Sequence, residues 1–137
     1  MRVFKSGAIR DNDKMKLDFD GAISPIVLER FVQYMNDHAN TAKGFRPCDD
    51  WQKGVPMSVY RKSFLRHSME AWKLGRAGAM IGDAIENLLC AVLFNVQGWL
   101  HEAIKARLAL AAVDATAAAR AAHARPARKR KAARRRR

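Results

Sequence analysis

The chain has 137 residues, and its 26 Lys and Arg against 13 Asp and Glu give a formal net charge of +13. This length fits one domain that buries a modest core without disulfides. The two cysteines form no C-x-x-C pair, and the longest apolar run is far shorter than the roughly 20 residues of a membrane span. A disulfide framework, a zinc site and a transmembrane segment are therefore not indicated. The N-terminus also lacks the apolar stretch of a signal peptide, so we expect a cytoplasmic protein.

The first 23 residues carry many charges and few apolar partners, which predicts an extended N-terminal segment. Ser24 followed by Pro25 is typical of a helix N-terminus, with a cap residue and then a proline at the first helical position. We expect a helix from there to about His38. Its apolar stripe is most simply a face turned toward the core, made of Val27, Leu28, Phe31, Val32 and Met35.

Residues 39 to 57 contain two glycines and two prolines and predict a long loop. Loops of this length inside a compact domain are often functional. Trp51 offers a flat ring for stacking a base, and Lys53 offers a cation for a phosphate. Packing of Trp51 onto the core and a solvated Lys53 are the structural alternatives.

A second helix is expected from about Val59 to Leu74, with Ser58 as its cap. On this helix His67 and Glu70 stand three residues apart and therefore share a face. His67 taken singly is more often a hydrogen-bonded or exposed residue than a metal ligand.

The strongest helical pattern runs from Asp83 to Glu102, where apolar residues recur at steps of three and four. Asp83 and Glu86 lie three apart at its start, where the helix dipole favours acids. Gly75, Gly78 and Gly82 predict a short turn before it, so the two helices should be antiparallel neighbours. The acidic pair would then face His67 and Glu70.

An imidazole and three carboxylates in one gap between helices could hold Mg²⁺ or Mn²⁺, because hard divalent ions prefer oxygen ligands. The candidate metal ligands are His67, Glu70, Asp83 and Glu86. Spacing alone is a weak signal, since acids three apart also occur on many solvated helix faces.

The positive charge is concentrated in residues 111–137, which hold ten Lys or Arg and one Asp, a net +9 that leaves +4 for the rest. The stretch is rich in alanine at first, then meets Pro126 and ends in a run of like charges. We expect fraying helix that passes into disorder. The run could contact nucleic acid nonspecifically, or it could be a solvated extension. The tail residues proposed for such contact are Arg128, Lys129, Arg130, Lys131, Arg134 and Arg135.

These elements together predict an all-α fold, a small antiparallel bundle of three to four helices. Three regions are expected: an extended segment over residues 1–23, a helical domain over residues 24–110, and an Ala/Arg-rich basic tail over residues 111–137, disordered at its end.

The phrases WQKG, RH and LLCAVLFN followed by LHE resemble small bacteriophage proteins classed with the dATP/dGTP diphosphohydrolases. That group is related to the MazG-like all-α nucleotide pyrophosphatases. The resemblance covers about residues 14 to 105. It implies hydrolysis of a nucleoside triphosphate, here a purine dNTP, to the monophosphate and pyrophosphate, in the host cytoplasm if the protein is phage-encoded.

The resemblance also implies roles for single residues. Glu70 matches the second acid of the first metal-binding pair, and Asp83 with Glu86 matches the second pair. His67 stands where the family has a glutamate, which is a departure, because imidazole is a poor Mg²⁺ ligand. Asn95 matches an asparagine that contacts sugar or base, but it lies about 180° around the helix from Glu86 at roughly 100° per residue. One ligand could reach both only if packing or a dimer wraps the site.

Glu70, Asp83 and Glu86 are therefore the candidate catalytic residues. By resemblance, a metal ion that they hold would neutralise the triphosphate and position a water for attack at the α-phosphorus. Trp51, Lys53 and Asn95 are the candidate substrate-binding residues, and a homo-oligomer is expected. The alternative is a noncatalytic phage protein that binds nucleic acid through its tail and uses its helices for self-association.

Overall fold

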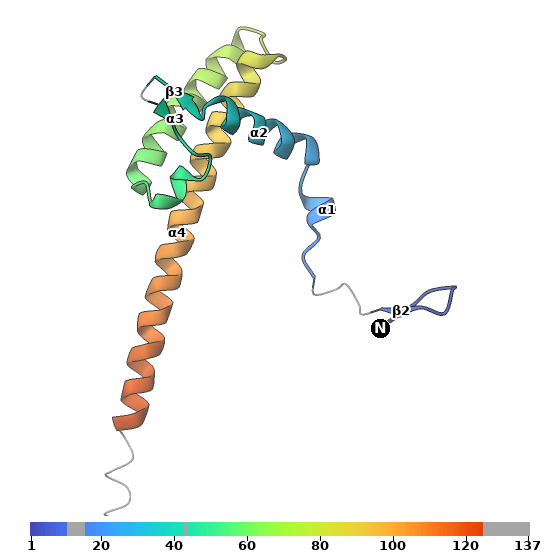
Figure 1. Ribbon diagram of the computed structural model, residues 1–137, viewed down its shortest axis with the longest axis vertical. Coiled ribbons are helices and arrows are strands. Elements are labelled where there is room, and N and C mark those ends of the chain that lie inside the picture. The colour runs from blue at the N-terminus through green and yellow to red at the C-terminus, as the bar shows by residue number, and fades with distance from the viewer. Residues whose placement is uncertain (11–15, 43, 125–137) are drawn as a thin grey trace, which may run out of the picture.

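The computed structural model describes residues 1–10, 16–42 and 44–124 (Figure 1). Most of these residues lie in α-helices, so the predicted all-α class is confirmed. The helices are α1 (Phe19–Ala22), α2 (Pro25–Asp37), α3 (Met57–Arg76) and α4 (Asp83–Ala124). Two antiparallel pairs of very short strands accompany them, β1 (Arg2–Val3) with β2 (Ile9–Arg10) and β3 (Asn40–Thr41) with β4 (Gly44–Phe45). One 3-10 turn, η1, spans Asp50–Lys53.

The antiparallel pair of α3 and α4 is the centre of the fold (Figure 1). Residues 77–82 join the two helices, and Gly78 and Gly82 there have φ angles of 85° and 106°. These angles are left-handed and suit glycine, which has no Cβ to clash. Because the connection is so short, α4 must return alongside α3, as the glycines predicted.

The closest approach of α3 and α4 is at Tyr60 and Gly98. Tyr60 is only 2% exposed, and a Cβ placed on Gly98 would lie 2.3 Å from its ring. The Tyr60 ring also meets Phe94 edge-on at a centroid distance of 6.1 Å, and Phe64 meets Trp99 at 6.5 Å. Aromatic residues of α3 therefore fill the space beside a glycine on α4.

The helix α2 crosses the α3/α4 pair and contacts α4 (Figure 1). Of its predicted apolar stripe, Phe31 is buried and Met35 is half-buried, whereas Val27, Leu28 and Val32 are exposed. The prediction that the whole stripe faces the core is wrong for these three residues, because α2 crosses α4 and only one part of it reaches the core.

Several predicted boundaries also change. The segment 1–23 is not uniformly extended: it contains the β1–β2 hairpin and the one-turn helix α1, where the Asp18 carboxylate accepts a hydrogen bond from the Gly21 backbone at 2.8 Å. Ser24 precedes α2 as expected, but its hydroxyl caps no backbone amide. Ser58 is not the cap of α3, because the helix begins one residue earlier, after Pro56. The loop of residues 39–57 includes the β3–β4 hairpin and η1.

The last helix is much longer than the sequence pattern suggested. It does not fade near residue 110 but continues to Ala124 without interruption. Alanine has the highest helix propensity, so the alanine-rich stretch can remain helical although every side chain from Ile104 to His123 is exposed. The predicted nucleic-acid contacts from Arg128 to Arg135 lie outside the described residues.

We expect Gly98→Ala to destabilise the protein although alanine favours helices. The added methyl group must displace the buried Tyr60 ring, and overpacking of a core typically costs about 1–3 kcal/mol. Thermal unfolding followed by circular dichroism measures the effect. The matched control is Gly75→Ala, whose Cβ would meet only the end of the flexible, exposed Met80 side chain at 3.1 Å. A Gly98→Ala protein as stable as the control would contradict the close approach.

Candidate functional site

Two adjoining pockets, each of about 200 Å³, lie where α2, the 39–57 segment, α3 and α4 meet. We call the first the aromatic pocket; its ring-bearing or apolar walls include Trp51, Val55, Val59, Tyr60 and Phe94. We call the second the basic pocket; its polar walls include Tyr34, His38, Arg46, Ser63, Arg66 and His67. The two pockets share five lining residues, namely Met35, Arg46, Ser63, Phe94 and Asn95.

Trp51 lines the aromatic pocket from η1. Its ring is half-buried and meets the His101 ring of α4 edge-on, with 4.9 Å between centroids and 84° between planes. The contact holds η1 against α4. Trp51 therefore packs onto the core, and it also presents a ring to the aromatic pocket.

Lys53 lies apart from both pockets. Its ammonium donates a hydrogen bond to the Asp50 carboxylate at 2.5 Å, and this contact raises the pKa of Lys53. The side chain is 77% exposed. Within the described part of the chain, Lys53 therefore forms a solvated ion pair with Asp50. Its predicted contact with a phosphate would need η1 to move.

Asn95 is 5% exposed and lines both pockets. Its side-chain amide donates a hydrogen bond to the Ala91 carbonyl one turn earlier, at 2.7 Å. Among the described residues no group donates to its amide oxygen. The amide oxygen of this residue, at the junction of two pockets, is suited to accept a hydrogen bond from a ligand, and Asn95 was predicted as a ligand contact.

Tyr60 contributes a second polar group. Its hydroxyl is the one buried side-chain oxygen or nitrogen without a partner in the part of the chain that the structure describes. Burial raises the pKa of Tyr60, and the negative charge of Glu102 adds to that rise. The sequence pattern identified Tyr60 only as a core residue.

His67 and Glu70 are brought together as their spacing predicted. The His67 Nδ1 lies 3.0 Å from the Glu70 carboxylate, and the His67 Nε2 lies 3.3 Å from a terminal nitrogen of Arg66. Since a guanidinium can only donate, these contacts fit an imidazole that carries its proton on Nδ1. Both ring nitrogens are then engaged, and a metal ion at Nε2 would have to displace Arg66.

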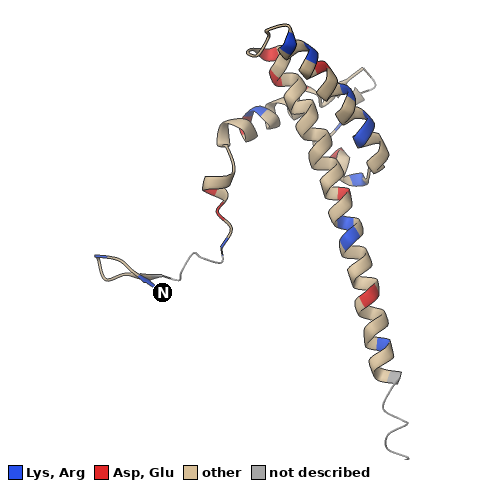
Figure 2. Cartoon of the chain, turned by 180° about the vertical axis from the view of Figure 1, so that it is seen from behind, with Lys and Arg blue, Asp and Glu red and all other residues tan. Residues whose placement is uncertain are grey.

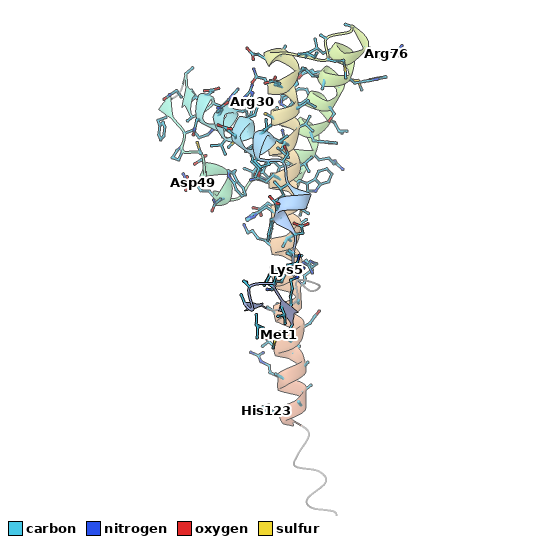
Figure 3. The ribbon with its side chains drawn as sticks, turned by 90° about the vertical axis from the view of Figure 1, so that its right-hand side faces the viewer. Met1, Lys5, Arg30, Asp49, Arg76 and His123 are labelled. Carbon is cyan, nitrogen blue, oxygen red and sulfur yellow. The ribbon has the colours of Figure 1, made fainter. Side chains whose placement is uncertain are left out.

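Glu86 is turned toward α2 instead of toward Glu70. Its carboxylate accepts a hydrogen bond from Arg30 Nε at 2.8 Å, and Arg30 also donates to the Asn87 side-chain oxygen at 2.7 Å. Arg30 lies where α2 meets α4 (Figure 3). The hydrogen bond to Glu86 raises the pKa of Arg30. Arg30 was not predicted as a site residue; the available signal was that it is the one cation of α2.

The four candidate metal ligands do not form one cluster in the described chain. Glu70 contacts His67, Glu86 contacts Arg30, and Asp83 lies in the first turn of α4. Among residues 1–10, 16–42 and 44–124, no group of three or more His, Cys, Asp or Glu could hold a metal ion. One chain in this arrangement therefore does not fit a complete Mg²⁺ or Mn²⁺ site, and no reaction step can be derived through such an ion.

No helix in the described part of the chain is both long and apolar enough to cross a membrane. No family model, curated protein or solved structure matches the chain.

Proposed function

We propose that the protein binds a purine deoxynucleoside triphosphate in the aromatic pocket and hydrolyses it to the monophosphate and pyrophosphate, in the cytoplasm of a phage-infected cell. The observation that carries the proposal is the aromatic pocket itself, where Trp51 and Phe94 offer ring surfaces beside the side chain of the buried residue Asn95. A base needs flat apolar surfaces and a few fixed polar groups, and this pocket combines them. The phage diphosphohydrolases that the sequence resembles supply the class of reaction.

The reaction adds one water across the bond between the α- and β-phosphates. The water oxygen bonds to the α-phosphorus, and the bond from that phosphorus to the bridging oxygen breaks, which releases pyrophosphate. A bound Mg²⁺ or Mn²⁺ would neutralise charge on the triphosphate. The proposed ligands Glu70, Asp83 and Glu86 can gather only if Arg30 releases Glu86 or a second chain contributes acids.

Self-association is part of this proposal because α4 carries an apolar face that no element of the described residues covers. Four of its exposed apolar side chains recur along one face at steps of seven and four residues: Leu89, Val96, Leu100 and Ile104. Uncharged residues cover most of α4 (Figure 2). The face continues into an apolar groove of about 350 Å³ between α2 and α4, lined by Ile26, Val27, Leu89 and Leu93 among others. We propose that a second copy of the chain covers it.

The test of the reaction is a panel of dNTPs and NTPs incubated with Mg²⁺ or Mn²⁺, with products separated and pyrophosphate measured. We expect pyrophosphate and monophosphate from dATP or dGTP. Glu86→Gln should abolish turnover and leave the fold intact, because the amide keeps a hydrogen bond to Arg30 but loses the charge. The control is Glu29→Gln, an exposed acid of α2. Turnover of Glu86→Gln at the wild-type rate would remove Glu86 from the site.

The basic tail separates this proposal from its alternative, a noncatalytic protein that binds nucleic acid. Removal of residues 111–137 takes away a net charge of +9. Unchanged pyrophosphate release after the deletion supports the hydrolase. Absence of turnover in both forms, with DNA binding that depends on salt and is lost on deletion, supports the alternative.

We expect Trp51→Ala to weaken nucleotide binding by about tenfold or more, since the stacking of one base on a ring is worth roughly 1–3 kcal/mol. Trp51→Phe should keep part of the affinity because it keeps a ring. The matched control is Trp72→Ala, which removes an exposed tryptophan of α3. Calorimetric titration with dGTP measures all three. Equal losses in the Trp51 and Trp72 variants would show that the aromatic pocket does not hold the base.

We expect Leu100→Lys to shift the protein from a dimer toward a monomer, because a charge in the middle of a buried apolar face is unfavourable. Light scattering after gel filtration measures the mass. Leu65→Lys on α3 is a matched control, since Leu65 is 58% exposed and Leu100 is 57% exposed. A wild-type protein that is monomeric at high concentration would refute the proposed use of this face.

A further inference from the structure

The basic pocket contains two arginines that come from different elements. Arg46 follows β4, and Arg66 lies on α3. Among the described residues, neither guanidinium pairs with a carboxylate; the contact of Arg66 is with the His67 ring. The Glu70 carboxylate, on the same helix as Arg66, pairs with His67 instead. Two cations without counterions on one pocket create a positive potential that an anion would satisfy.

Arg66 is held in place by a short chain of hydrogen bonds. The Glu70 carboxylate contacts the His67 Nδ1 at 3.0 Å, and the His67 Nε2 contacts Arg66 at 3.3 Å. His67 and Arg66 both line the basic pocket. The carboxylate therefore orients the imidazole, and the imidazole orients the guanidinium.

Arg46 is fixed through its backbone. Its amide donates to the Ala39 carbonyl at 2.7 Å, which closes the β3–β4 hairpin, and Pro47 restricts the backbone of Arg46, the residue before it. Burial raises the pKa of the Tyr34 hydroxyl, and the positive charge of Arg46 acts against this rise. Because Tyr34 lines the basic pocket, the Arg46 charge acts at the pocket wall. The side chains of Arg46 and Arg66 thus approach one space from the hairpin and from α3.

We propose that the basic pocket binds the phosphate chain of a nucleotide directly through Arg46 and Arg66, with His67 as the positioning residue of Arg66. The inference rests on the proposed function and deepens it, since it names the anion subsite of the same ligand. A base beside Trp51 leaves its sugar near Asn95, one of the residues shared by both pockets, and its phosphates in the basic pocket. Guanidinium groups suit this role because they form paired hydrogen bonds to phosphate oxygens.

The test is calorimetric titration of the full-length protein with inorganic tripolyphosphate and with dGTP, in EDTA at near-physiological salt. The double variant Arg46→Ala/Arg66→Ala should weaken both ligands by at least about 10-fold to 100-fold, because the loss of one charge-assisted hydrogen bond alone costs about that order in affinity. The matched control is Arg107→Ala/Arg120→Ala, which removes the same charge from exposed positions of α4. It should leave both affinities within about twofold if binding is specific to the pocket.

Equal weakening in the pocket and control variants, or no binding of either ligand in EDTA, would overturn the inference. Tripolyphosphate binding without dGTP binding would also overturn it, because the subsite would then serve a free polyphosphate. The result for the anion subsite can be distinguished from the result for hydrolysis. Pyrophosphate release that survives the pocket variant with unchanged KM refutes the subsite but not the enzyme, whereas pocket-specific binding without turnover refutes the enzyme but not the subsite.

A separate experiment tests whether His67 positions Arg66. His67→Ala should weaken tripolyphosphate binding with little change in Tm, since the side chain is not part of the core. Arg66→Ala should then cost much less in the His67→Ala background than in the wild type, because residues that act through one another are not additive. Fully additive losses would show that His67 does not position Arg66.

Discussion

The whole arrangement depends on the contact between the Tyr60 ring and the backbone of α4 at Gly98. A Cβ at residue 98 would lie 2.3 Å from the ring, so this glycine sets how closely α3 and α4 approach. The approach places Phe94 and Asn95 of α4 beside Ser63 and Arg66 of α3, and both pockets open along that line. A wider separation of the two helices would remove the common wall of the pockets.

The second organising feature is that charges are paired on one side of the molecule and unpaired on another. Arg30 binds Glu86 and Asn87 and attaches α2 to the start of α4. Arg46 and Arg66 instead line a pocket and have no carboxylate partner among the described residues. An arginine thus has a structural role where an acid faces it. It is suited to bind a ligand where no acid faces it.

The exposed apolar face of α4 connects the fold to the proposed reaction. A single chain leaves Leu89, Val96 and Leu100 in solvent, and it also leaves the candidate acids in separate contacts. Covering the face with a second copy would bury apolar surface, which is the dominant favourable contribution to association. The same event could bring acids of two chains together, so assembly and catalysis would be linked through α4.

The sequence by itself determined the helices, because apolar spacing, Pro25 and the glycines between α3 and α4 act locally. It also identified Trp51 and His67 as residues of interest from their type and place, and Asn95 through the family resemblance. Only the tertiary structure decided that Glu86 turns to Arg30 and that Asn95 lies between two pockets. The spacing of residues along one helix determines which of them share a face. It does not determine which residues of another helix pack against that face. The crossing of α2 over α4 settles that, and it is not encoded in a local pattern.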